Sequence, residues 1–362
     1  MDDSKHRVAI IGCGRMGQYY ADVYSRRPDT KIVAIAEYND DRRKAVGERF
    51  GVSALYKDVE SLLNDVVPDI AAIITPTKYY RDAVVACAEA GVKGISTDKP
   101  IAARLSDADE MVSACEKRGA IYSGGNLQRA IPEVQDTAER IRAGEFGELI
   151  GASVHAWGGE ISGGGCQHIA VLTLLAGARI DEVIAWGTPP EALEQDHDGG
   201  LLIHGRFRLS SGIDCDVFGT PTPCRGVCVW SQDSLIQWDW APPVIFKGFD
   251  RTGARVRIDP GFGYEPYEQR DGTEKYLSHS ISRFLAAVKT GSEPAVSGDD
   301  LRHALEVAVA CKRSATHGNT PVGLPLEDRS LTLYPSAYRW SGGDQTGNPQ
   351  PAEDALRFVV PK

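Results

Sequence analysis

RVAIIGCGRMG, residues 7–17, places a strand-like apolar run directly before a glycine-rich turn, and an amphipathic helical stretch follows the turn. Its glycines, Gly12, Gly14 and Gly17, have the spacing G-x-G-x-x-G. The first glycine permits a tight turn, the second lets the backbone approach a pyrophosphate at the helix N-terminus, and the third lets the helix pack closely on the strand. The segment therefore predicts a dinucleotide-binding strand–turn–helix unit.

Glu37 ends the next apolar run, twenty residues beyond the last glycine of the turn. An acidic residue there accepts hydrogen bonds from the adenosine ribose and repels a 2′-phosphate, so we expect NAD rather than NADP. Arg42 and Arg43 follow shortly, and they either reach a 2′-phosphate or are solvated on a helix. Arg15 and Met16, inside the turn, complete the cofactor contacts predicted for this region.

The composition is that of a globular protein with two domains. The chain has 362 residues, of which 42% are hydrophobic and 25% charged, and this excludes a fibrous or wholly disordered chain. The net charge of −10 with no basic block argues against nucleic-acid and membrane partners. No apolar run reaches the roughly 18 residues of a membrane span, and the N-terminus lacks a signal-peptide pattern, so we expect a cytoplasmic protein. Its eight cysteines are expected to be reduced thiols, and we expect no metal site.

The chain changes character near residue 125. Before it, short apolar runs alternate with amphipathic stretches, as in repeated strand–helix units of a parallel sheet. After it come longer strand-like segments typical of a mostly antiparallel sheet, and all six tryptophans lie beyond residue 150. We therefore expect an α/β fold with a nucleotide-binding domain over residues 1–125, a substrate-binding and oligomerisation domain over 126–334, and an irregular extension over 335–362.

Two apolar strands of the first half end in residues suited to a ligand site. Thr75-Pro76 ends one of them, and Asp98-Lys99-Pro100 ends the next. Ligands of open parallel sheets bind beyond the carboxyl ends of the strands, so both tips are expected near the nicotinamide end of the same crevice. Lys99 could hold a substrate hydroxyl there, although an isolated Lys-Pro is more often part of a loop.

Taken together, these motifs resemble the glucose-fructose oxidoreductase and inositol dehydrogenase family (Gfo/Idh/MocA) over roughly residues 7–325. The resemblance implies an N-terminal Rossmann domain and a C-terminal α/β domain with a large, mostly antiparallel open sheet that often mediates oligomers, here a homodimer or homotetramer. It also implies oxidation or reduction of a sugar, inositol or similar polyol with NAD(P). The motifs that carry it are G-C-G-R-M-G, Glu37, T-P-x3-Y at 75–80, A-E-A-G at 88–91, D-K-P at 98–100, G-N-x-x-R at 125–129, I-R-A-G-E-F-G-E-L-I at 141–150 and K-T-G-S-E-P-A-V-S-G-D-D at 289–300.

The resemblance assigns roles to three residues. Lys99 matches the family lysine that assists proton transfer, Asn126 matches the asparagine near the nicotinamide, and Arg129 falls in the substrate-facing stretch. Two positions depart from the family pattern, since Asp98 replaces a glutamate and Tyr80 replaces a common histidine.

A larger departure lies in the second domain. Most active members carry D-x-x-x-H on a helix, and the matching positions here are Gly164 and His168. His168 can still take the hydroxyl proton as hydride leaves the same carbon, because an imidazole titrates near neutral pH. Gln167, Glu160 or a backbone carbonyl is then expected to orient it.

The neighbouring His155, Trp157, Glu160 and Gln167 are further candidates for substrate contact. His155 could equally be a surface residue of an alternating strand, and tryptophans on a sheet are more often core or interface residues.

The sequence thus predicts an NAD-dependent oxidoreductase acting on a secondary alcohol of a sugar, glycoside or cyclitol, with Lys99 and His168 in proton transfer. Two alternatives stay open. One is redox-neutral glycoside cleavage or epimerisation through a transient keto intermediate with bound NAD. The other is a non-catalytic NAD-binding regulatory protein.

Overall fold

The computed structural model describes residues 5–124, 127–264 and 277–342. These residues form two compact units. The first contains the described residues up to 124 together with 280–302 and 336–342, and the second contains 127–264, 277–279 and 303–335. From the sequence we expected 280–302 within the second domain and 335–362 as a separate extension, whereas the first unit includes 280–302 and, among the described residues, 336–342.

The first unit is built on a six-stranded sheet in the order β3-β2-β1-β4-β5-β6, in which every neighbouring pair is parallel. The order reverses between β1 and β4, and at such a point the strand ends leave a crevice in which ligands bind. The strands are β1 (His6–Ile11), β2 (Thr30–Ala36), β3 (Leu55–Tyr56), β4 (Ile70–Ile73), β5 (Gly94–Thr97) and β6 (Ile121–Gly124).

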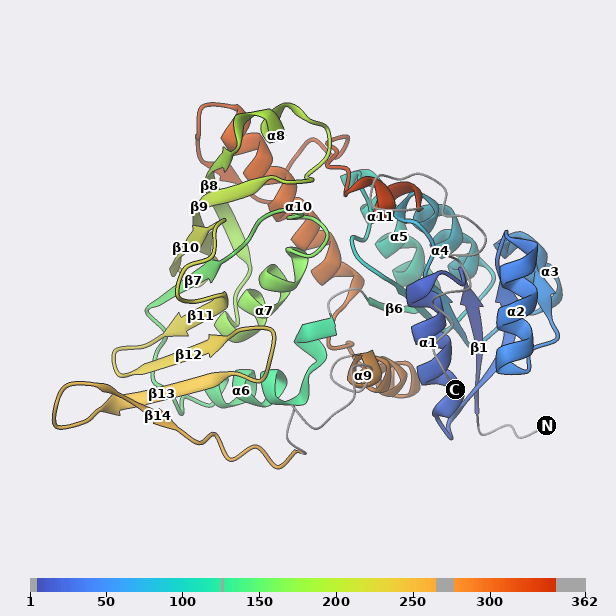
Figure 1. The fold of residues 1–362 in the computed structure, drawn as a ribbon, viewed down its shortest axis with the longest axis horizontal. Helices are drawn as coiled ribbons and strands as arrows, with labels where there is room; N and C mark the ends of the chain where they lie inside the picture. Colours follow the sequence, from blue (N-terminus) through green and yellow to red (C-terminus); the bar gives the residue numbers. More distant parts are fainter. Residues whose placement is uncertain (1–4, 125–126, 265–276, 343–362) are drawn as a thin grey trace. The chain divides into compact units, whose positions relative to one another are not determined.

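Helices cover this sheet, as Figure 1 shows. They are α1 (Arg15–Arg26), α2 (Asp40–Phe50), α3 (Val59–Asp65), α4 (Tyr80–Glu89), α5 (Leu105–Arg118) and α9 (Leu277–Thr290), with the short η1 (Thr77–Tyr79) and α11 (Ala337–Ser341). The core of the sheet is almost wholly apolar, and all four residues of β4 are completely buried. This agrees with the continuous apolar strands expected of a parallel sheet that is covered on both faces.

Segment 280–302 packs against strands β5 and β6 at one edge of this sheet. A Cβ on Gly94 of β5 would lie 2.6 Å from the Val288 side chain and 2.9 Å from Phe284, so α9 approaches this strand closely. The Ser123 hydroxyl of β6 donates a hydrogen bond to the Val296 carbonyl (2.7 Å). Sequence periodicity predicts such a helix but does not say which sheet it covers.

The second unit is built on a nine-stranded sheet in the order β14-β13-β12-β11-β7-β10-β9-β8-β15. Only the β7–β10 pair is parallel, and the other pairs are antiparallel. The strands are β7 (Gly151–His155), β8 (Ile180–Thr188), β9 (Leu202–Leu209), β10 (Asp214–Phe218), β11 (Gly226–Trp230), β12 (Ser234–Trp238), β13 (Val244–Phe249), β14 (Arg255–Ile258) and β15 (Val322–Gly323).

Helices α6 (Pro132–Arg142), α7 (Cys166–Ala176) and the later part of α10 (Gly298–Thr316) accompany one face of this sheet, and the short α8 (Pro190–Glu194) and η2 (Leu127–Ala130) complete the unit (Figure 1). The alternating burial of β9 and β10 places Arg206, Asp216 and Phe218 on the other face. Phe218 there is 39% exposed and Trp186 of β8 is 49% exposed. The expected fold class, a parallel Rossmann sheet followed by a large, mostly antiparallel sheet, is confirmed.

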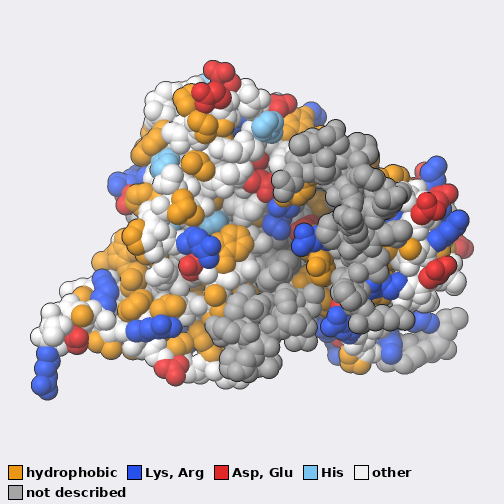
Figure 2. Space-filling model, viewed as in Figure 1, with side chains coloured by type: hydrophobic (Ala, Val, Ile, Leu, Met, Phe, Trp, Pro, Cys, Tyr) orange, Lys and Arg blue, Asp and Glu red, His pale blue; other side chains and the backbone are white. Residues whose placement is uncertain are grey.

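Side chains of both charges are interspersed over the described surface seen in Figure 2, and neither sign forms a continuous area there. No helix within the described ranges has both the length and the hydropathy to cross a membrane. All eight cysteines are free thiols, and all except Cys224 are buried.

Candidate cofactor-binding and active site

The glycine turn between β1 and α1 has a backbone that only glycine accommodates at two of its three positions. Gly12 has φ +88°, and a Cβ there would lie 2.6 Å from the Ile74 carbonyl oxygen. A Cβ on Gly17 would lie 2.0 Å from the Gly12 carbonyl oxygen, so α1 packs directly on the turn. These contacts are the tight turn and the close helix–strand packing that the motif predicts.

Gly14 differs from these two glycines, because a Cβ there would meet no atom within 4 Å. It is the N-cap of α1 and provides no side-chain cap, so the helix begins with N–H groups that are not capped by their own N-cap residue. An uncapped helix N-terminus beside open space suits a pyrophosphate, whose charge the helix dipole stabilises.

Two side chains hydrogen-bond the backbone of Cys13, one to its N–H and the other to its carbonyl. The Cys13 N–H donates to Glu37 Oε2 (2.8 Å), and Gln18 Nε2 donates to the Cys13 carbonyl (3.0 Å). Glu37 is only 4% exposed and Gln18 is 1% exposed, so both hydrogen bonds are buried. Burial raises the pKa of the Cys13 thiol, and the Glu37 carboxylate adds to that shift. Sequence reasoning missed this clamp, since the motif concerns the glycines and the ribose contact alone.

Residues that follow Glu37 in the chain also contact its carboxylate. Its Oε1 accepts from the Asn39 N–H (3.0 Å) and lies 3.3 Å from Arg42 Nη1. Arg43 donates to the Glu37 carbonyl (2.7 Å) and pairs with Asp40 (2.7 Å). Arg42 therefore compensates the charge of the acidic residue that the sequence assigns to the ribose.

The tips of β4 and β5 carry the other predicted residues of this unit. Thr75 and Pro76 follow β4 and are half-buried. Asp98 follows β5 and is buried, and its Oδ1 lies 3.5 Å from Lys99 Nζ. The Lys99–Pro100 peptide is cis.

Tyr80, which replaces a family histidine, is a core residue. Burial raises its pKa well above the usual value, and the nearby Asp98 carboxylate adds to this. The same two causes act on Tyr20. A phenol in this environment stays protonated at physiological pH, so Tyr80 does not supply the acid–base function of an imidazole.

Asn126 lies outside the described residues. Arg129 lies in η2, where its Nη1 is 3.5 Å from both the Ala170 carbonyl and the Thr173 hydroxyl of α7. Gln167 accepts from the Gln128 N–H (3.2 Å). Arg129 and Gln167 thus join η2 to α7 within the second unit.

His168 lies in the first turn of α7 and is 4% exposed. Neither of its ring nitrogens has a hydrogen-bond partner among the described residues. The ring meets Trp238 and Trp240 edge to face, at centroid distances of 5.7 and 5.4 Å. Trp240 has φ +56°, a strained conformation for a residue with a side chain. A buried polar group without a partner costs about 1–3 kcal/mol, and such groups in native proteins are often functional.

Burial also sets the charge of this imidazole. It lowers the pKa of His168 to about 4, against the smaller opposing effects of the Gly165 carbonyl and the Asp239 carboxylate. At neutral pH the ring is therefore uncharged and one nitrogen is free to accept a proton.

His155, a predicted substrate contact, lies on a different face of the sheet from His168. Side chains of a strand alternate between the faces of the sheet, and His155 shares its face with Ser153 and Phe218. This face is opposite to the one that carries α7 and His168. Both ring nitrogens are already engaged, Nε2 with the Ser153 hydroxyl (2.7 Å) and Nδ1 with the Thr222 hydroxyl (2.8 Å).

Trp157 is likewise a core residue and not an open stacking face. It is 0% exposed, packs edge to face on Phe207 and donates from Nε1 to the Gly165 carbonyl (3.0 Å). Trp157 therefore supports the start of α7. Glu160, by contrast, is half-buried and its Oε2 accepts from the Gly164 N–H (3.3 Å), beside the helix that carries His168.

Comparison with known proteins gives the family of the chain. Residues 6–126 match the sequence model of the Gfo/Idh/MocA oxidoreductase family, which has an NAD-binding Rossmann fold. Over 343 residues the chain is 32% identical to D-apiose dehydrogenase of Paraburkholderia graminis, covering 87% of this chain and 89% of that protein. The chain belongs to the Gfo/Idh/MocA family. It is also 25% identical to myo-inositol 2-dehydrogenase of Thermotoga maritima over 340 residues, which cover 85% of this chain and 96% of that protein.

Solved structures show the same fold throughout. An NAD-binding oxidoreductase from Klebsiella pneumoniae aligns with a TM-score of 0.76 at 17% identity, covering 90% of this chain and all of that one. Levoglucosan dehydrogenase in complex with NADH and levoglucosan aligns with a TM-score of 0.74 at 18% identity, covering 89% and 100%. As a Gfo/Idh/MocA protein, the chain is an oxidoreductase with a nicotinamide cofactor site in its first unit.

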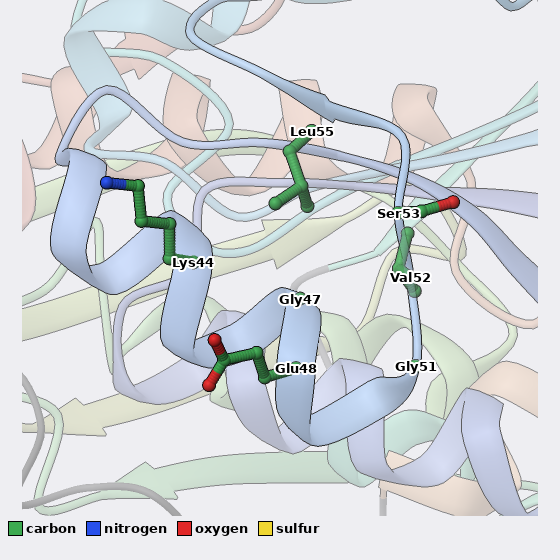
Figure 3. Close-up of a pocket in the computed structure, with 7 residues that line it drawn as sticks. All are labelled: Lys44, Gly47, Glu48, Gly51, Val52, Ser53 and Leu55. Carbon is green, nitrogen blue, oxygen red and sulfur yellow. The ribbon is translucent and has the colours of Figure 1, made fainter.

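One surface pocket of this Gfo/Idh/MocA chain lies away from the glycine turn, between the last turns of α2 and the segment leading to β3 (Figure 3). Glycine backbone and aliphatic carbon make up most of its wall, and Lys44 and Glu48 extend from α2 beside it. It is not at the carboxyl ends of the strands, and we assign no ligand to it. The lining residues are Lys44, Gly47, Glu48, Gly51, Val52, Ser53 and Leu55.

Proposed function

We propose that the protein is an NAD-dependent oxidoreductase that oxidises or reduces a secondary alcohol of a sugar, glycoside or cyclitol. The observation that carries the proposal is His168, a buried imidazole that is neutral at physiological pH and has no partner on either nitrogen within the described residues. Relatives point to the same substrate class. They include the two dehydrogenases named above and D-glucoside 3-dehydrogenase of Escherichia coli, which is 27% identical over 178 residues.

The cofactor is held by the first unit in this proposal. The uncapped N-terminus of α1 and the open side of Gly14 receive the pyrophosphate, and Glu37 accepts from the ribose hydroxyls. NAD is preferred, because a 2′-phosphate would meet the carboxylate of Glu37, and the charge of Arg42 is already engaged by that carboxylate. The other residues proposed to contact the cofactor are Gly12, Arg15, Met16, Thr75, Pro76, Lys99 and Asn126.

When bound, the nicotinamide accepts or donates the hydride. The protein then has to position the reacting carbon of the substrate and to transfer the hydroxyl proton. His168 takes the hydroxyl proton when the alcohol is oxidised and returns it in the reverse direction. Lys99 donates a hydrogen bond to the substrate oxygen and shares the proton transfer. Arg129 and Gln167 keep η2 fixed against α7 and so shape the substrate side.

The test is a screen of the purified protein with NAD against inositols, free sugars and glycosides. Net formation of NADH with a polyol is the expected result. Cleavage or epimerisation of a glycoside without net NADH would replace the proposal with a redox-neutral reaction through a transient keto intermediate. Binding of NAD without turnover of any polyol would identify a regulatory protein instead.

A further inference from the structure

The indole N–H of Trp238 is a buried donor for which the described residues offer no acceptor, and the side chain is 0% exposed. An indole nitrogen can only donate, and a buried tryptophan usually finds an acceptor for it. Trp157, the other tryptophan that is 0% exposed, follows this rule, since its N–H donates to the Gly165 carbonyl (3.0 Å). Trp238 departs from it, and an unpaired buried donor in a native protein calls for an explanation.

Trp238 lies beside the proposed base. It is the last residue of β12, and its ring meets the His168 ring edge to face, with 5.7 Å between the centroids and 83° between the planes. Both ring nitrogens of His168 and the indole nitrogen of Trp238 lack partners within the described ranges. A neutral acceptor on α7 and a neutral donor on β12 thus lie side by side, and no described residue engages either of them.

Packing fixes the orientation of the indole. A Cβ on Gly226 of β11 would lie 3.0 Å from Trp238 Cε3, so this edge of the ring lies against the neighbouring strand. Nε1 belongs to the opposite edge of the indole, and the N–H therefore points away from that glycine. Trp240 packs on both of the other rings, with its centroid 5.3 Å from that of Trp238 and 5.4 Å from that of His168. The donor and the base are thus held in place relative to each other.

We propose that Trp238 is a catalytic residue whose indole N–H donates a hydrogen bond to the substrate oxygen from which His168 takes the proton. Oxidation moves a hydride from the carbon to the nicotinamide and the hydroxyl proton to His168, and the C–O bond becomes a carbonyl. Negative charge develops on the oxygen as its proton leaves, and an oriented N–H in a buried site stabilises that charge. This inference rests on the proposed function and adds to it a neutral donor at the reacting oxygen.

An indole suits this position beside the base. It carries no lone pair that accepts a hydrogen bond, so it does not compete with His168 for the hydroxyl proton. It also brings no charge into a buried site, where an unpaired cation would be costly.

The activity test uses two changes at position 238. Trp238→Phe removes the N–H together with part of the ring. Site-specific replacement of Trp238 by benzothienylalanine keeps the size of the ring and puts sulfur in place of the N–H, so it removes the donor alone. Trp230→Phe is the matched control, because alternation along β11 and β12 places Trp230 on the other face of the sheet, with its ring over Gly151. The first substrates are myo-inositol and methyl β-D-glucopyranoside, followed by any other polyol that the screen with NAD identifies.

We expect both changes at position 238 to lower kcat by about 10- to 100-fold, with KM for the polyol and Kd for NAD within about threefold, because the hydrogen bond strengthens as charge develops on the oxygen. Reduction of the corresponding ketone should slow by the same factor, since both directions share one transition state. Trp230→Phe should keep kcat within about twofold. A normal kcat in the benzothienylalanine protein, or a loss that appears only in KM, would overturn the proposal.

A second measurement follows the N–H itself and does not depend on turnover. In protein with ¹⁵N-labelled tryptophan, the indole resonance of Trp238 is the one that Trp238→Phe lacks. Its proton should move downfield when the polyol binds to the NAD-loaded protein, because the N–H then gains an acceptor. The Trp157 N–H, which already has one, should stay in place. A Trp238 resonance that does not move at saturating polyol would overturn the proposal.

The two measurements separate this inference from the proposed function. Turnover by the unmodified protein, with a kcat and a resonance that do not respond at position 238, would refute only the role of Trp238. If no polyol yields NADH, the proposed function is refuted, and the resonance then decides on binding alone whether the indole is a substrate donor.

Discussion

The burial of His168 predicts a specific acid sensitivity of the folded protein. Its pKa is about 4 in the folded protein, whereas an unfolded histidine titrates near 6.5. Between these values the unfolded chain binds a proton that the folded chain excludes, so the free energy of unfolding falls as the pH falls. The contribution of this one group is fully present above about pH 7 and is lost progressively toward pH 4. The expected loss is on the order of 1 kcal/mol at pH 5.5 and roughly twice that at pH 4.5.

The substitution that isolates this contribution is His168→Leu, which removes the titrating ring and leaves an apolar side chain among the tryptophans. The free energy of unfolding is measured by urea titration at pH 7.5, 5.5 and 4.5, with tryptophan fluorescence as the probe. Five of the six tryptophans belong to the second unit, so the signal reports the unit that contains His168.

At pH 7.5 the free energies of unfolding of the unmodified protein and of His168→Leu differ by an amount that does not depend on protonation of His168. This difference is the baseline. Toward pH 4.5 the variant should lose roughly 2 kcal/mol less than the unmodified protein. All other titrating groups, including His155, are present in both proteins and cancel. If the free energy of unfolding changes with pH in the same way in both proteins, His168 binds a proton as readily in the folded chain as in the unfolded one. That result would refute the assignment of a buried neutral base.

Four further outcomes are expected. NAD should bind at least about tenfold tighter than NADP, because Glu37 repels a 2′-phosphate; comparable affinities in a fluorescence titration would contradict this. Gly14→Ala should weaken NAD binding with little change in melting temperature, whereas Gly17→Ala should destabilise the fold by at least about 2 kcal/mol; equal effects on stability would count against the turn geometry. His168→Ala should lower turnover by about 10²- to 10⁴-fold with NAD affinity nearly intact, and Lys99→Ala should do likewise; near-normal turnover would remove the residue from the mechanism. Light scattering at micromolar concentration should show a dimer or tetramer formed through the nine-stranded sheet, and a 39.2 kDa monomer would argue against it.

The parts of the fold that sequence reasoning predicted are those with local signals. Strand–helix alternation before residue 125 predicts the parallel sheet, and longer alternating segments after it predict the antiparallel one. The return of 280–302 to the first sheet has no local signal. The amphipathic pattern of α9 indicates that one face of the helix is buried, but it does not indicate against which strand. The contact with Gly94 links residues almost two hundred positions apart in the chain.

The site residues also divide into those that a local sequence pattern predicts and those that it does not. The glycine turn was predictable because three glycines and one acid at fixed spacing encode a backbone geometry. The prediction for His155 and Trp157 rests on their closeness in sequence to His168, and closeness in sequence does not account for the alternation of side chains along a strand. That alternation places His155 on the opposite face, while the packing of Phe207 and Gly165 around Trp157 takes its ring out of reach.

The proposed cofactor preference and the fold depend on the same side chain, that of Glu37. The carboxylate proposed to discriminate against a 2′-phosphate also accepts a hydrogen bond from the buried N–H of Cys13, and a buried N–H without an acceptor costs about 1–3 kcal/mol. Gln18 donates to the Cys13 carbonyl, which belongs to the next peptide group, so it does not replace that acceptor. Removing the carboxylate to admit NADP would therefore also loosen the turn that receives the pyrophosphate. The proposed preference for NAD would therefore be coupled to the stability of the glycine turn itself.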